Sequence, residues 1–367
     1  MTSGRQVRFG ATAAPTSAGK PDYELYREVI EDCLLIDELG FDAVWFVEHA
    51  FSDYLPHPSP LITMSHVAAQ APDLALGSAV LVLPWYNPMR LAGEIAMVSA
   101  LTRAPLYIGI GRGTAKSEYD NYNVDMSTAR ARMNETFKIV SQALKGEPFT
   151  YEGEFFKLEK PVRLRPGPGP DARIQFYGAI GSPSGAENVA DLGLPLLCQS
   201  QFPDWLIAKV IESWQAKSAE LDRSYTSPNV IQVRTLIRDT DEEAFALARD
   251  LYPRGFRVQY DHYVSEADPW EGIDEYQGFK RAFEGLAKLK DPANIQPFIE
   301  TQAVGSPERV AKRLQEYIDL GFDHIMLHAT FPEFPQEVRR DTYRRFARDV
   351  APMLTDSMRE PRAARVT

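Results

Sequence analysis

The stretch Gly40-Phe41-Asp42-Ala43-Val44-Trp45-Phe46-Val47-Glu48-His49 decides the fold. Its first three residues are typical of a helix end and a turn, and Val44 to Val47 are bulky residues without polar alternation. Such a run predicts a strand that is buried on both faces, as in a parallel sheet. Glu48 and His49 follow at the carboxyl end of this strand, where α/β proteins place their active sites. His49 is therefore a candidate catalytic residue, although a histidine that only caps a strand would read the same way.

The same local unit recurs along the chain. A helix ends at a Leu-Gly pair, a tight turn follows, and a buried apolar strand begins within a few residues. The unit occupies residues 39–47 and 320–327, and a weaker copy occupies residues 192–198. Its repetition predicts parallel strands joined by right-handed helical crossovers.

Hydrophobic patterning predicts about eight strands that alternate with helices over most of the 367 residues. We expect these strands at residues 7–11, 44–47, 74–82, 106–110, 174–178, 194–198, 230–237 and 324–328. Eight such units favour a (β/α)8 TIM barrel, and a doubly wound open sheet is the alternative. We expect one barrel domain over residues 1–355, followed by a flexible tail over residues 356–367.

Three segments stand outside this alternation. Residues 149–158 alternate around a Glu-Gly pair and predict a hairpin outside the main sheet. Residues 115–127 are polar, and we expect them to be irregular. A predicted helix that begins at Asp241 is expected to end at Tyr252, before Pro253. Residues 253–300 then form an insertion without a clear strand.

Composition excludes several classes of protein. The net charge of −11 argues against nucleic acid and anionic membranes, because phosphate-binding surfaces are usually basic. No window approaches the ~18 apolar residues of a membrane span, and the first residues lack a signal-peptide core. Cys33 and Cys198 lie far apart, and the six histidines form no HExxH motif, so we expect no disulfide framework and no metal site. A cytoplasmic enzyme is the expectation.

In a barrel, several chemically distinctive segments would meet at one mouth. These are His49, the Ala79-Val80 pair, the Arg112-Gly113-Thr114 segment and the loop Gly181-Ser182-Pro183-Ser184-Gly185. The loop suits a phosphate, because its glycines allow close approach, its serines donate, and a helix begins there. Arg112 would supply a planar fork for the same anion. Ser184 and Glu187 also fit a capping box, which needs no ligand.

A resemblance to a known family rests on several motifs in order. The residues are Gly40 to His49, Gly77 to Arg90, Gly109 to Gly113, Gly178 to Pro195 and Val304 to Glu308. Together they resemble the bacterial luciferase-like flavin monooxygenases, and Arg112 makes the chain similar to a catalytic α-type subunit. The resemblance implies a (β/α)8 barrel that binds reduced FMN or, in some members, the deazaflavin F420.

The resemblance also implies roles for individual residues. His49 matches the catalytic histidine, and Ala79-Val80 matches a non-prolyl cis peptide beneath the isoalloxazine ring. The remaining implied cofactor-binding positions are Arg112, Gly113, Thr114, Gly181, Ser182, Ser184 and Gly185. The implied reaction uses reduced FMN and O2, through a C4a-(hydro)peroxide, to oxidise a small organic substrate. An F420-dependent hydride transfer and a non-catalytic flavin-binding subunit are the alternatives; intact His49 and Arg112 argue against the second.

The resemblance assigns the insertion at 253–300 to a lid over the substrate. The helical spacing of Phe279, Phe283 and Leu286 favours core packing, whereas residues 260–270 show no clean period and are the better pocket candidates. The chain has no Gly-x-Gly-x-x-Gly with a later acidic residue, as a nucleotide-binding site would show. We therefore expect a separate flavin reductase, and a homodimer or heterodimer.

Overall fold

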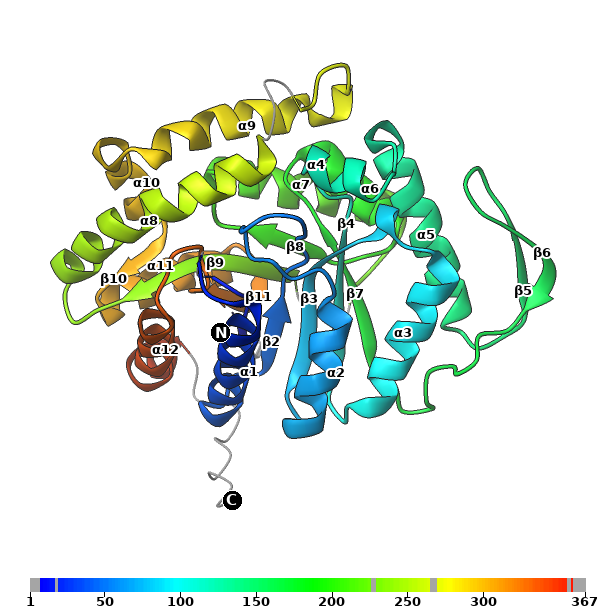
Figure 1. Cartoon of the computed structure of the whole chain (residues 1–367), viewed down its shortest axis with the longest axis horizontal. Coiled ribbons are helices and arrows are strands. Elements are labelled where there is room, and N and C mark those ends of the chain that lie inside the picture. Colours follow the sequence, from blue (N-terminus) through cyan, green and yellow to red (C-terminus); the bar gives the residue numbers. More distant parts are fainter. Residues whose placement is uncertain (1–6, 17–18, 226–228, 265–268, 355–357, 359–367) are drawn as a thin grey trace.

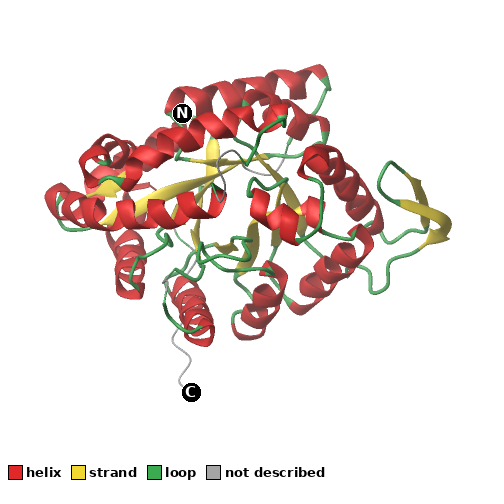
Figure 2. Ribbon diagram, turned by 45° about the horizontal axis from the view of Figure 1, so that its top comes forward, coloured by secondary structure: helices red, strands yellow, loops and turns green. Residues whose placement is uncertain are grey.

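A computed structural model describes residues 7–16, 19–225, 229–264, 269–354 and 358. Eight parallel strands form a closed barrel, because β9 pairs with both β8 and β11 and so joins the two ends of the sheet. Figure 2 shows these strands inside a ring of helices. The barrel strands are β1 (Arg8–Thr12), β2 (Ala43–Phe46), β3 (Ala75–Val82), β4 (Leu106–Gly111), β7 (Ile174–Ala179), β8 (Leu196–Gln199), β9 (Asn229–Ile237) and β11 (Phe322–His328). The predicted (β/α)8 barrel is confirmed, and the alternative prediction of a doubly wound open sheet is wrong.

Helices cover the outside of the barrel (Figure 1). Several begin at a side chain that accepts backbone N–H groups, as Asn87, Thr240 and Ser306 do. The covering helices are α1 (Asp22–Glu38), α2 (Pro60–Gln70), α3 (Pro88–Leu101), α5 (Ala129–Ala143), α6 (Pro183–Asp191), α7 (Asp204–Glu220), α8 (Asp241–Tyr263), α11 (Pro307–Asp319) and α12 (Gln336–Arg345). A π-helical turn (Phe346–Val350) and α13 (Ala351–Leu354) follow the last of these.

Aromatic side chains fill the interior of the barrel. The Trp45 ring stacks on Tyr107 with centroids 5.6 Å apart, and it meets Tyr177 and His324 edge-on. Gly10 leaves room for it, since a Cβ there would lie 2.6 Å from Trp45 Nε1. Side chains thus fill the interior of the barrel. Functional groups can therefore gather only at its mouth, at the carboxyl ends of the strands.

The predicted hairpin is confirmed. Strands β5 (Phe149–Glu152) and β6 (Lys157–Val162) pair antiparallel, and Figure 1 shows them projecting away from the barrel. The expectation of an irregular segment at 115–127 is wrong, because α4 (Lys116–Asn121) forms there and buries Glu118 and Tyr119.

The predicted end of α8 at Tyr252 is also wrong. The helix continues through Pro253 to Tyr263. Tyr252 packs on Phe334 with centroids 5.2 Å apart, and Phe256, beyond the proline, packs on Phe298 at 5.0 Å. Tertiary packing on both sides of Pro253 therefore outweighs the backbone hydrogen bond that proline cannot donate.

The rest of the insertion is mostly helical. It contains α9 (Gln277–Ala287), α10 (Gln296–Thr301) and short 3-10 turns, and it leads to β10 (Ala303–Gly305), which pairs with the end of β9. In Figure 1, α8 and α9 run across one end of the barrel. Except for Met358, the predicted flexible tail at 356–367 lies outside the described residues, so the domain boundary stays a prediction.

No helix in the described part of the chain is both long and apolar enough to span a membrane.

Candidate active site

The carboxyl ends of the barrel strands open into a cavity of about 460 Å³. Nine of the ten residues that the sequence assigned to the site line it together, although they come from four separate segments of the chain. These are His49, Ala79, Val80, Arg112, Gly113, Thr114, Gly181, Ser182 and Gly185. Ser184 is the exception: it is exposed and does not line the cavity.

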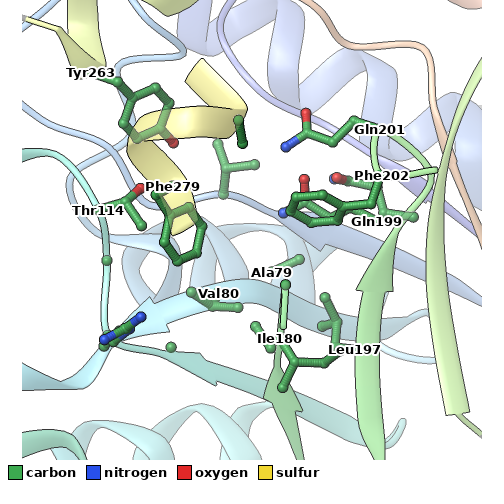
Figure 3. Close-up of a pocket in the computed structure, with 18 of the residues that line it drawn as sticks. Ala79, Val80, Thr114, Ile180, Leu197, Gln199, Gln201, Phe202, Tyr263 and Phe279 are labelled. Atoms are coloured by element: carbon green, nitrogen blue, oxygen red, sulfur yellow. The ribbon is translucent and has the colours of Figure 1, made fainter. Parts of the chain in front are cut away.

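The Ala79–Val80 peptide bond forms part of the cavity wall and is cis, as the resemblance implied. Gly111, on the neighbouring strand β4, makes room for it, because a Cβ at Gly111 would lie 2.8 Å from Val80 Cγ2. Figure 3 shows Ala79 and Val80 on the strand side of the cavity and Phe279 on the lid side. A flat ligand between them would rest on backbone and small apolar side chains.

The loop before α6 presents the amino end of a helix to the cavity. Ser182 is the N-cap, and its Oγ accepts the N–H of Gly185 at 3.2 Å. The capping box that was expected at Ser184 is therefore wrong, since the cap lies two residues earlier. Gly181, Ser182 and Gly185 line the cavity, so the positive end of the helix dipole can face an anion there.

Two arginines that line the same cavity converge on Glu275. Arg112 Nη1 lies 2.6 Å from Glu275 Oε2, and Arg130 Nε lies 2.8 Å from the same oxygen. Arg112 Nη2 also donates to the Glu275 backbone carbonyl at 3.0 Å, and its guanidinium lies 4.2 Å from the centre of the Tyr276 ring. Two guanidinium groups that share one carboxylate can bind an anion. In this structure the Glu275 carboxylate occupies that position.

Arg130 was missed from the sequence. It lies on α5, in the first turn of an ordinary amphipathic helix, and nothing in the pattern of α5 distinguishes it from a surface arginine. Only the fold brings it to the cavity wall.

His49 belongs to a cluster of three ionisable side chains. Its Nδ1 lies 3.5 Å from Glu118 Oε1, and His262 Nε2 lies 3.7 Å from the same oxygen. Glu118 Oε1 also accepts the N–H of Ala50 at 2.7 Å. Two imidazoles and a carboxylate, with ligand atoms within 4.8 Å of one another, are a donor set that could hold a divalent transition metal. The sequence predicted no such grouping, because its members come from the segment after β2, from α4 and from the unforeseen end of α8.

Burial keeps the His262 imidazole neutral. It lowers the pKa of His262 to about 2, and the nearby His49 acts in the same direction. Ser52 Oγ lies 2.7 Å from His262 Nδ1, so that nitrogen has a partner, while Nε2 faces Glu118. The ring centroids of His49 and His262 are 5.0 Å apart.

Glu48 is a buried carboxyl group next to the site. Its Oε2 accepts the N–H of Val82 at 2.6 Å, and its Oε1 accepts the Tyr86 hydroxyl. Desolvation raises the pKa of Glu48 to about 8, so near neutrality the group is largely protonated. It ties the end of β2 to the end of β3, two residues beyond the cis peptide.

The lid contributes differently from what the sequence predicted. Phe279, Phe283 and Leu286 line the cavity instead of packing only in a core. Trp270, which was expected at the pocket, is buried within the lid and does not line the cavity; its indole N–H donates to the Thr114 carbonyl at 2.9 Å. Tyr263 does line the cavity, so one part of the 260–270 prediction is confirmed.

Comparison with known proteins bears on the family. The model of the luciferase-like monooxygenase family matches residues 7–324. The oxygenase component of a flavin-dependent trigonelline monooxygenase from Acinetobacter baylyi is 24% identical over 94% of each chain. An F420-dependent glucose-6-phosphate dehydrogenase from Kineococcus radiotolerans is 26% identical over 96% of this chain and 98% of its own.

A solved structure shares the fold. It is the oxygenating constituent of 3,6-diketocamphane monooxygenase from Pseudomonas putida, in complex with FMN. The TM-score is 0.73 at 18% identity, over 95% of this chain and 99% of that one.

Proposed function

Because the chain belongs to the luciferase-like monooxygenase family, we propose that it is a monooxygenase that uses reduced FMN and O2 to oxidise a small organic substrate. One observation carries the proposal: a single cavity joins His49 and the cis peptide to an anion site made by two arginines and a helix amino end. A flavin mononucleotide has a flat ring system and a phosphate, which match these two ends.

The residues present fit FMN. Arg112, Arg130 and Ser182 would hold the phosphate, which would take the position of the Glu275 carboxylate between the arginines. Ala79, Val80 and Gly111 would support the ring system. Bound reduced flavin supplies the electrons with which O2 is activated; the chain itself supplies binding, orientation and exclusion of water.

His49 is the proton-transfer group of the proposal. It lines the cavity, its side chain is 16% exposed, and it lies 3.5 Å from a buried carboxylate oxygen of Glu118. An imidazole can accept or donate a proton, and a carboxylate within hydrogen-bonding reach can orient the ring. Phe279, Phe283 and Leu286 keep water from this side of the cavity.

A hydride-transfer reaction with F420 is the second candidate. It is favoured by the F420-dependent relative, which aligns with nearly the whole chain. The non-catalytic subunit is disfavoured, because His49 and Arg112 both face the cavity. The relative named as an oxygenase component supports a separate flavin reductase as partner. The dimer and the cytoplasmic location stay predictions.

Anaerobic titration of the protein with FMN, reduced FMN and F420 tests the proposal. We expect reduced FMN to bind more tightly than F420. Stopped-flow mixing of the reduced complex with O2 should then give flavin reoxidation kinetics that differ from those of free reduced FMN. Preferential binding of F420, or reoxidation identical to that of free flavin, would overturn the assignment.

A further inference from the structure

Arg234, on β9, is a buried cation whose donors are largely unused. The residue is 4% exposed and lines the cavity. Its Nη2 donates to Gln201 Oε1 at 3.1 Å. Its Nε and Nη1 are buried and have no hydrogen-bond partner among the described residues. Two of its three nitrogens are thus available to a ligand.

No carboxylate in the described part of the chain forms an ion pair with Arg234. Its guanidinium lies over aromatic rings, 4.0 Å from the centre of Phe331 and 5.3 Å from that of Phe256. Arg339, another deeply buried arginine, is paired with Asp32 at 2.9 Å. Burying an uncompensated charge is costly, so proteins normally pair it with an opposite charge. Arg234 departs from that rule at a cavity wall, where a ligand can supply the missing anion.

The surroundings of Arg234 separate it from the anion site at Arg112. Gln199, Gln201 and Gln232 line the same cavity and offer amides, while Leu55, Leu289 and Phe298 supply apolar wall. Tyr54 belongs to the same hydrophobic cluster as Phe256 and Phe331, the rings over which Arg234 lies, and it packs against His49 with ring centroids 4.7 Å apart. An anion held by Arg234 would therefore lie in the part of the cavity that contains the proposed proton-transfer group.

We propose that Arg234 anchors the substrate through a carboxylate, so that the enzyme oxidises a small organic acid with an apolar body. The free Nε and Nη1 donors bind the carboxylate, the glutamine amides complete its hydrogen bonds, and the apolar wall holds the remainder beside His49. That the bound acid is a substrate rests on the proposed monooxygenase function. The anion site itself does not require that function.

The experiment measures carboxylate preference in the flavin-free protein by isothermal titration. The probes are benzoate and hexanoate, each compared with its neutral amide, benzamide or hexanamide. We expect the wild type to bind at least one acid about tenfold or more tightly than its amide, as a hydrogen-bonded charge pair should. Arg234→Met should abolish this preference. Failure of the wild type to prefer either acid overturns the proposal.

Arg238→Met is the matched control. Arg238 follows the same strand and is paired with Asp341 at 3.1 Å, so its removal should leave the carboxylate preference intact. Equal loss in both variants would show a non-specific effect of charge and would overturn the proposal.

Thermal unfolding separates a binding role from a structural one. In anion-free buffer, Arg234→Met should keep or raise Tm, because it removes an uncompensated buried charge. Benzoate should raise the Tm of the wild type but not of the variant. A lower Tm with the benzoate shift retained would assign Arg234 to packing and overturn the inference.

FMN binding distinguishes this inference from the proposed function. Arg234→Met should bind FMN as the wild type does. Loss of FMN in this variant, without a carboxylate preference in the wild type, would make Arg234 a cofactor contact and leave the flavin function standing. The protein could instead show an Arg234-dependent carboxylate preference and bind no flavin. That result would support the anion site at Arg234 and contradict the proposed monooxygenase function.

Discussion

At the scale of single residues, the cavity is lined by two arginines that we propose to bind anions and that have different surroundings. Arg112 shares a carboxylate with Arg130, whereas Arg234 has only neutral neighbours among the described residues. A cofactor phosphate would replace the existing partner of Arg112. A substrate carboxylate would be an anionic partner for Arg234, which has none among the described residues. The two ends of the cavity can thus be tested separately.

Arg112→Met should weaken FMN about tenfold or more and leave riboflavin nearly unchanged. The reason is that a guanidinium–phosphate hydrogen bond contributes about 1.5–3 kcal/mol, and riboflavin has no phosphate. Fluorescence titration with both ligands measures the difference. Arg103→Met is the control, since Arg103 is exposed and pairs with Asp73 away from the cavity. Equal losses for FMN and riboflavin would rule out a phosphate contact.

His49→Ala should retain reduced-FMN binding while changing the rate of its reaction with O2 by at least about tenfold, the low side of acid–base effects. The imidazole and Glu118 form the proposed proton-transfer pair, at 3.5 Å. Anaerobic titration followed by stopped-flow oxidation checks both parts. An unaltered oxidation rate would remove His49 from the mechanism.

At the scale of elements, the insertion places a carboxylate of its own at the proposed phosphate site. Glu275 lies in the 3-10 turn Asp274–Tyr276, directly before α9, and bridges Arg112 on the barrel and Arg130 on α5. The lid helix α9 also supplies Phe279 and Phe283 to the cavity. Entry of a phosphate would therefore require this turn to release the arginines.

Glu275→Gln should bind FMN about two- to fivefold more tightly than the wild type, with riboflavin unchanged. The gain is small because the Glu275 side chain is 44% exposed, and partly exposed ion pairs contribute about 1 kcal/mol or less. Fluorescence titration measures it, with Glu284→Gln on the exposed face of α9 as control. Weaker FMN binding would show instead that Glu275 holds the lid over the bound cofactor.

At the scale of the whole molecule, buried ionisable groups set the pH range of stability. Desolvation lowers the pKa of four buried histidines: His57 to about 4, His262 to about 2, His324 to about 3, and His328 well below its usual value. Between pH 6.5 and 4 the unfolded chain takes up protons that these groups refuse in the native state, so stability falls on acidification. Glu48 acts in the opposite direction: its contribution is complete below pH 4.5 and is lost as pH rises through about 8.

Tm should therefore be highest at about pH 7, where proton uptake by four unfolded histidines and proton release by the unfolded Glu48 balance; the histidines dominate below that value and Glu48 above it. Scanning calorimetry between pH 5 and 9 checks this profile. Glu48→Gln should flatten the alkaline decline, and His324→Met should reduce the acid decline. The exposed His66→Asn is the control and should alter neither. A Tm that rises steadily from pH 6.5 to 8 would contradict the assignment to Glu48.

The amino-acid sequence alone determined the barrel and most of its mouth. Gly40, Gly193 and Gly321, which were interpreted as helix ends, all have positive φ, and the strand that follows each of them is part of the barrel. These features are local: a glycine ends a helix, and an apolar run without alternation forms a buried strand, wherever they occur. Because strand ends of a closed barrel share one mouth, the fold class also brought His49, Val80 and Arg112 together.

Only the tertiary structure decided which distant side chains complete the site. Glu118 lies in a segment predicted as irregular, Arg130 in a helix whose pattern does not distinguish it from a surface arginine, and His262 in an insertion predicted as a lid. Arg234 lies within a correctly predicted strand, yet its lack of a carboxylate partner depends on what surrounds it. Periodicity records which face of an element is buried, but pairing and burial of charge depend on contacts between residues far apart in the chain. Those contacts form only when the barrel closes and the lid packs across its mouth.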